Sequence, residues 1–162
     1  MSNEQPDSQT LIIGIGEYRI GKNPMSSIGL GSCIGLVLDS RKGGMGGMAH
    51  VMLPDSQGRG DRPGKFADTA VEILVTDLAA AGCRSSQIVA KLAGGASMFK
   101  GFSGNLNIGE RNADAIIAAL KQRNIEIAGI EIGGTMGRTV TYYPAVGGRV
   151  VVRSADGQIK EI

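Results

Sequence analysis

The sequence predicts an α+β fold with a mostly antiparallel sheet. Segments of strand length come in runs, and the two helical segments lie mid-chain instead of alternating with strands. Glycine is unusually common, at 26 of 162 residues, and glycine-rich turns separate the apolar runs. An apolar content of 42% at this length suits one domain with a core of its own. We expect residues 1–10 to be a disordered tail and residues 11–162 to form that domain.

The first half of the chain reads as three strands. Residues 11–20 form an apolar segment interrupted by Gly14 and Gly16, which predicts a bulged strand, and a turn follows at 21–24. Two further strands flank a glycine-rich turn at 40–47. The first carries Ile34, Leu36 and Leu38, and the second carries Val51, Met52 and Leu53.

The second half contains both helices. Apolar residues at helical spacing predict a helix over 66–81, with Gly82 as its stop, and a second helix over 110–123. A strand is expected at 88–93, followed by an irregular segment at 96–107. The remaining strands are expected at 125–132, 139–143, 149–153 and 159–162, joined by glycine-containing turns.

Composition excludes several classes of function. A net charge of +2, without a basic run or an aromatic platform, argues against nucleic-acid binding. The polar start is not a signal peptide and no apolar run reaches membrane-spanning length, so we expect a cytoplasmic protein without membrane insertion. One histidine and two cysteines without a C-x-x-C pair predict no metal site, and we expect no cofactor.

The residues that carry chemistry are Cys33 and His50. Two neighbouring strands joined by the 40–47 turn would bring them together, and a cysteine beside a histidine is the minimum for a thiol nucleophile. Glycines around Cys33 would let a substrate approach, and the backbone N–H groups of Ser32 and Cys33 are candidates for an oxyanion hole. The alternative is that both are buried structural residues. Cys83, which follows a helix end and has no histidine available, is interpreted as structural.

Two other interpretations of the glycines around Cys33 fail. The spacing Gly29, Gly31, Gly35 misses the dinucleotide-binding pattern by one residue, and a strand follows where a helix should. The segment 31–35 fits a nucleophile elbow, but that motif also needs a helix after it and a histidine late in the chain.

A polar loop at 54–65 follows the histidine strand. Long ordered loops often carry function, so Arg59 and Arg62 are candidates for contact with a substrate or an acidic partner. A solvated surface loop is the alternative. Phe102, in the irregular glycine-rich segment, is a further candidate for a contact surface, with core packing as its alternative.

Six sequence blocks, in order, resemble the CheD family of chemoreceptor glutamine deamidases. They span about residues 11–153, nearly the whole chain. The blocks are LGSCI at 30–34, HVMLP at 50–54, KFAD at 65–68, GGASMF at 94–99, NIGERN at 107–112 and GGTMGR at 133–138.

The resemblance implies an α/β sandwich and an activity. The implied reaction is hydrolysis of glutamine side-chain amides in chemotaxis receptors to glutamate, with release of ammonia through a thioester. By this likeness Cys33 is the nucleophile and His50 the general base and acid. The family's third position, a threonine, is Ser27 here; its hydroxyl would orient the imidazole, and Ser26 would supply the hydroxyl if the register shifts.

The resemblance also implies partners: the cytoplasmic domains of chemotaxis receptors, and a CheC-type CheY phosphatase that family members bind. An alternative function is therefore an interaction protein that regulates such a phosphatase with weak or no catalysis. A thiol protease or a transglutaminase-like acyltransferase would use the same two residues with a different acceptor.

Overall fold

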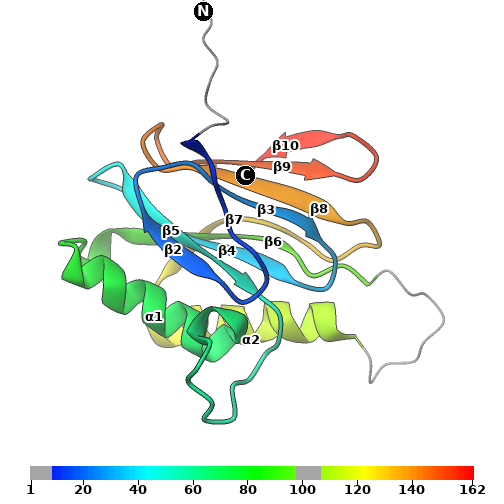
Figure 1. Ribbon diagram of the computed structural model, residues 1–162, viewed down its shortest axis with the longest axis horizontal. Coiled ribbons are helices and arrows are strands. Elements are labelled where there is room, and N and C mark those ends of the chain that lie inside the picture. Colours follow the sequence, from blue (N-terminus) through cyan, green and yellow to red (C-terminus); the bar gives the residue numbers. More distant parts are fainter. Residues whose placement is uncertain (1–8, 98–106) are drawn as a thin grey trace, which may run out of the picture.

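The computed structural model describes residues 9–97 and 107–162, and their elements form three layers (Figure 1). One five-stranded sheet has the order β1-β3-β8-β9-β10, and a second has the order β2-β5-β4-β6-β7. The second sheet lies between the first sheet and the two helices (Figure 1). The predicted α+β class is confirmed.

The outer sheet consists of β1 (Leu11–Ile12), β3 (Met25–Leu30), β8 (Arg138–Tyr143), β9 (Arg149–Ser154) and β10 (Ile159–Glu161). The central sheet consists of β2 (Tyr18–Gly21), β5 (Met45–Val51), β4 (Ile34–Ser40), β6 (Ile88–Gly94) and β7 (Glu126–Ile132). Only β1–β3 and β6–β7 pair in parallel among the described strands, so antiparallel pairing dominates as expected.

Strand β4 is buried on both faces because it lies between two cores. Its residues Ile34, Leu36 and Leu38 pack in the cluster that the helices cover, whereas Val37 packs in the cluster between the sheets. Residues two apart in a strand share a face, so the side chains of Cys33 and Val37 point toward the outer sheet. The sequence therefore places every second residue of this strand in the space between the sheets.

Both helices lie where the periodicity predicts them. Helix α1 (Ala67–Ala80) buries Val71, Leu74 and Leu78, and Gly82, which follows its C-cap Ala81, has a φ of +97°. The Gly82 N–H donates to Ala79 O at 3.0 Å and the Cys83 N–H donates to Leu78 O at 2.8 Å, which is a Schellman cap. Helix α2 (Ile108–Gln122) begins with Asn107 as its N-cap, and the Asn107 side chain accepts a hydrogen bond from the Glu110 N–H. No helix within residues 9–97 and 107–162 is long and apolar enough to cross a membrane.

The expected strand over 11–20 is wrong in one respect: the chain forms two strands in different sheets. β1 pairs with β3 of the outer sheet, and β2 pairs with β5 of the central sheet. The crossing segment turns at Gly14 and Gly16, where Gly16 has φ +79° and the Glu17 N–H donates to Gly14 O at 2.9 Å. A bulge would have kept one strand, but the left-handed backbone at Gly16 reverses the chain instead.

Two strand boundaries near the candidate residues also differ from expectation. β5 spans 45–51, so it begins before the end of the expected 40–47 turn, and residues 52–53 fall outside it. β3 was not expected, because its serines and Gly29 do not form an apolar alternation. The expected tail at 1–10 lies outside the described residues except for Gln9 and Thr10.

Gly46 allows the two sheets to approach closely, which gives a stability prediction. A methyl group there would run into the Tyr142 hydroxyl and the Leu38 carbonyl, both in the buried interior. We expect Gly46→Ala to lower the free energy of unfolding by about 3 kcal/mol in urea denaturation, as overpacking does. Gly43→Ala is the control: its methyl would meet only Ser40 Oγ, at 3.8 Å, so equal destabilisation by both variants would contradict this account.

Candidate active site

Cys33 and His50 lie on the same face of the central sheet. The β4–β5 ladder pairs Gly35 with His50, and Cys33 is two residues before Gly35. The Cys33 and His50 positions are therefore diagonal neighbours, which in antiparallel sheets lie about 7–8 Å apart and within reach of long side chains. A Cβ at Gly35 would meet Leu30 and Val140 of the outer sheet, so this shared face is the one between the sheets. Cys33 is partly buried and His50 is 5% exposed.

The turn that carries Cys33 is held through its carbonyl groups. Gly31 O accepts from the Ala96 N–H at 2.8 Å, Cys33 O accepts from the Gly95 N–H at 2.9 Å, and Ser32 O accepts from Asn112 Nδ2 at 3.0 Å. Within residues 9–97 and 107–162, the backbone N–H groups of Ser32 and Cys33 donate to no acceptor. These are the two N–H groups that the sequence analysis predicts as candidates for an oxyanion hole.

A strap formed by residues 13–17 holds His50. The His50 Nδ1 lies 3.0 Å from Ile13 O, and because a carbonyl only accepts, Nδ1 carries the proton. The strap also pairs with the His50 backbone: the Gly16 N–H donates to His50 O, and the His50 N–H donates to Glu17 O. In the neutral ring, Nε2 is then the basic nitrogen.

Ser27 and His50 meet at one carbonyl. The fully buried Ser27 hydroxyl lies 3.1 Å from Ile13 O and 3.4 Å from Met48 Sδ, so it contacts the same oxygen that accepts from His50. No direct Ser27–His50 hydrogen bond occurs in the part of the chain that the structure describes. The Ser26 hydroxyl instead lies 3.1 Å from Thr141 Oγ1, its cross-strand partner in β8. Of the two serines, Ser27 is the one beside the imidazole.

Burial keeps both groups neutral in the resting site. Desolvation raises the pKa of the Cys33 thiol above its ordinary 9.0. Desolvation also lowers the pKa of His50 below 6.5, although the Ile13 hydrogen bond and the Glu17 carboxylate act in the opposite direction. Near neutral pH the pair is thus a thiol and an uncharged imidazole, which suits general-base activation.

The two candidate arginines bind the protein's own backbone. Arg62 Nη2 donates to Ile15 O at 2.7 Å and lies against Gly16, so it supports the strap. Arg59 Nε donates to Ser56 O at 3.3 Å, and its guanidinium lies over the Phe66 ring. Contact of either side chain with a substrate stays a prediction. Phe102 lies outside the described residues.

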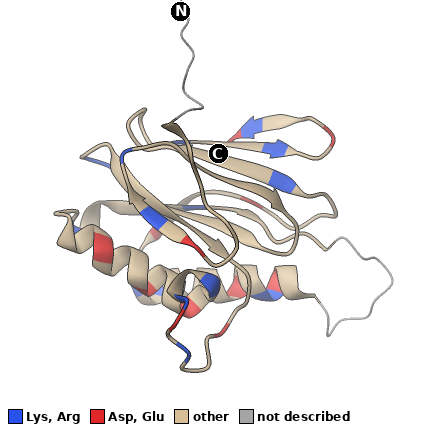
Figure 2. Ribbon diagram, viewed as in Figure 1, with Lys and Arg blue, Asp and Glu red and all other residues tan. Residues whose placement is uncertain are grey.

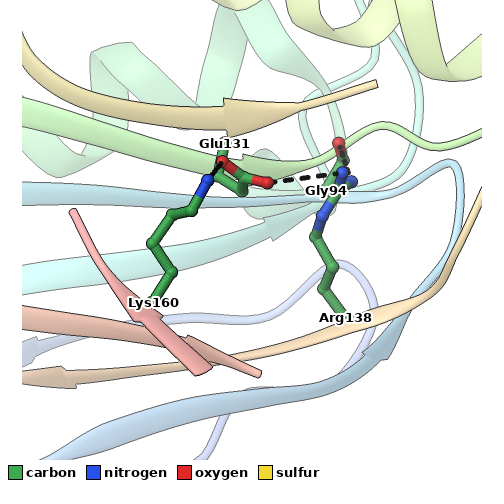
Figure 3. A network of polar contacts seen from close by, with 4 residues as sticks. All are labelled: Gly94, Glu131, Arg138 and Lys160. Carbon is green, nitrogen blue, oxygen red and sulfur yellow. Dashed lines mark hydrogen bonds and ion pairs between the residues drawn. The ribbon is translucent and has the colours of Figure 1, made fainter. Parts of the chain in front are cut away.

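A buried arginine of the outer sheet binds the central sheet (Figure 3). Arg138 of β8 is 7% exposed, and its Nη1 donates to Gly94 O at 2.9 Å. Its Nη2 lies 3.9 Å from Glu131, which also pairs with Lys160 at 2.9 Å. Gly94 is the ladder partner of Ile34, the residue after Cys33. The network therefore fixes the sheet spacing at the end of the sandwich where Cys33 lies.

Cys83 lies away from these groups, in the cluster under the helices, where it is 8% exposed. Both cysteines are free. This placement is consistent with the structural role expected for Cys83.

Sequence reasoning missed two groups that hold the site. The Ile13 carbonyl carries no sequence signal, because any residue supplies one. Asn112 did carry a signal: it is a polar residue beside the buried Ala113 of an amphipathic helix, and it is fully buried. Such a residue needs hydrogen-bond partners and so indicates a specific contact.

Comparison with known proteins gives a consistent family. A family model described as CheD chemotactic sensory transduction matches residues 52–154, a range that begins just after His50. The chemoreceptor glutamine deamidase CheD of Thermotoga maritima is 45% identical over 157 residues, covering 93% of this chain and 98% of that protein. A protein of Archaeoglobus fulgidus named as a probable chemoreceptor glutamine deamidase CheD is 42% identical, covering 92% and 96%. One from Methanosarcina mazei is also 42% identical, covering 98% and 75%.

Proposed function

The chain belongs to the CheD family, and we propose that it hydrolyses glutamine side-chain amides of chemoreceptors to glutamate with release of ammonia. Its similarity to named deamidases over nearly its whole length supports this activity. The observation that carries the mechanism is the shared sheet face of Cys33 and His50. We place the domain at 11–162 and the enzyme in the cytoplasm, where it would meet the receptors' cytoplasmic domains.

The proposed reaction uses only protein groups and water. His50 Nε2 takes the Cys33 proton, and the thiolate attacks the carboxamide carbon. The backbone N–H groups of Ser32 and Cys33 stabilise the oxyanion. The C–N bond then breaks, and ammonia leaves with the proton from His50. Water, deprotonated by His50, attacks the thioester; the C–S bond breaks, and glutamate and the free thiol form.

The test is incubation of the protein with a glutamine-containing cytoplasmic signalling fragment of a chemoreceptor. We expect ammonia release and a Gln-to-Glu mass change in peptide mass spectrometry. Methylamine added as a competing acceptor separates hydrolysis from acyl transfer, since an acyltransferase would produce methylated glutamine. No conversion at any glutamine would contradict the enzyme and favour the interaction protein.

We also propose that the receptor and a CheC-type phosphatase cover the same face. Met52, two residues after His50, is 38% exposed, and Ile15, on the strap, is 52% exposed. Apolar side chains left exposed beside a site suit a protein surface as partner. Nucleic acid is not the expected partner, because Lys/Arg and Asp/Glu intersperse along α2 and β9–β10, and the charged residues of α1 are all acidic (Figure 2).

Ser27 gives a prediction of modest size. Ser27→Ala removes the hydroxyl at Ile13 O but leaves the His50 hydrogen bond, so we expect kcat to fall about fivefold, the equivalent of one hydrogen bond of about 1 kcal/mol. Ser27→Thr restores the family's residue and should stay within about twofold of wild type. Steady-state kinetics on the receptor fragment measures both. An unchanged kcat in Ser27→Ala would contradict a role of Ser27 in positioning His50.

A further inference from the structure

The geometry of the Cys33 turn determines where its N–H groups point. A peptide unit is planar and trans, so its C=O and N–H point in opposite directions, and the chain has no cis bond among its described residues. Whatever holds Ser32 O therefore also aims the Cys33 N–H. That holder is the side-chain amide of Asn112, at 3.0 Å.

The same amide reaches the other strand of the site. Asn112 Nδ2 also donates to Met52 O at 3.0 Å, and continuing the β4–β5 register places Met52 opposite Cys33. One NH2 group thus joins the segment before Cys33 to the segment after His50. Both of its hydrogens are used, and no other neutral side chain of this size offers two donors on one atom.

Asn112 carries an unmet acceptor as well. It is 0% exposed, and its Oδ1 has no hydrogen-bond partner among the described residues. Reversing the amide would point Oδ1 at two carbonyl oxygens, so the orientation is set by Ser32 and Met52. A buried amide that leaves one atom unsatisfied in order to bind two carbonyls is not explained by packing, since leucine would fill the same space without that cost.

We propose that Asn112 is a positioning residue that fixes the Cys33 N–H in line with the oxyanion. This inference rests on the proposed function, because it assumes that Cys33 is the nucleophile. Asn112 is fully buried and its side-chain amide binds the Ser32 and Met52 carbonyls, so it acts through the Ser32–Cys33 peptide plane. Its effect should therefore appear in the step that develops an oxyanion and not in the nucleophilicity of the thiol.

Two readouts separate these steps in Asn112→Leu. Deamidation passes through an oxyanion, whereas alkylation of Cys33 by iodoacetamide does not. We expect kcat on the receptor fragment to fall about 30-fold or more, toward the effect of losing an oxyanion-hole donor. We expect the KM for the receptor fragment and the rate of Cys33 alkylation to stay within about threefold of their wild-type values. The pH dependence of the alkylation should not change. If the leucine variant does not fold, Asn112→Ala takes its place with the same expected results, because alanine also carries no donor for the two carbonyls.

Asn107→Ala is the matched control. It weakens the cap of the same helix without touching Ser32 or Met52, and we expect kcat to change less than threefold. An Asn112→Leu kcat within threefold of wild type would overturn the inference, and so would an equal loss of kcat and alkylation rate. Cys33→Ala in the same assay keeps the two claims apart. If it is inactive while Asn112→Leu is active, only the inference fails; if it is active, the proposed mechanism fails too.

Discussion

Cys33→Ala should fold normally and lose deamidase activity by about 10⁴-fold or more, as removal of a covalent nucleophile does. A thioester needs a thiol, and among the described residues Cys33 is the cysteine on this sheet face, whereas Cys83 packs under the helices. The alanine loses only a partly buried sulfur at the edge of the inter-sheet cluster, so stability should change little. Ammonia release and the Gln-to-Glu mass change measure the activity, and thermal unfolding monitors the fold.

Cys83→Ala is the control for this prediction. Cys83 packs under the helices, so its loss should cost about 1 kcal/mol of stability through a small cavity and leave kcat within twofold. We therefore expect Cys33→Ala to lose activity but keep its stability, and Cys83→Ala to lose some stability but keep its activity. Activity retained in Cys33→Ala, or lost in Cys83→Ala without unfolding, would contradict the assignment of Cys33.

The helices and most strands could be predicted because their signals are local. The buried positions of α1 recur at helical spacing, and Gly82 takes the left-handed conformation that ends the helix. The family expectation drawn from six short blocks is confirmed by relatives at 42–45% identity.

The layer assignment of the N-terminal segment could not be predicted. Residues 11–20 look like one strand, but pairing with β3 in one sheet and with β5 in the other divides them. The two partner strands, β3 and β5, belong to different sheets. The strand propensity of residues 11–20 does not say with which strand each residue will pair. β3 was missed for the same reason, since its serines are buried only by the sheets that enclose it.

In the candidate site too, some groups could be predicted from the sequence and others could not. Cys33 and His50 stand out because their side chains carry chemistry, and the register places both on one face. What holds them is mostly backbone: the Ile13 carbonyl holds His50, and the amides of Gly95 and Ala96 hold the Cys33 turn. Backbone groups are the same at every position, so only the fold identifies them. Ser27 was assigned to His50 from the resemblance, and its contact through Ile13 could not be seen without coordinates.

His50→Asn should lower kcat about 10³-fold, within the range for loss of a general base. Asparagine is the sharpest replacement, because its side-chain N–H can take the place of Nδ1 and keep the hydrogen bond to Ile13 O. The strap at 13–17 then stays in place, and the variant removes the basic Nε2 without unfolding the site. Kinetics on the receptor fragment, with thermal unfolding as the check on stability, measures the effect.

The pH dependence tests the same assignment independently. Burial lowers the pKa of His50, so the neutral base persists in the wild type until the pH falls below 6.5, and kcat/KM should decline only below that pH. His50→Asn has no such base, and its residual activity should rise with ionisation of the thiol, whose pKa lies above 9.0. The acid limb should therefore vanish and be replaced by an alkaline rise. An acid limb that survives unchanged in His50→Asn would assign the base to another group, because no titration of residue 50 would remain to produce it.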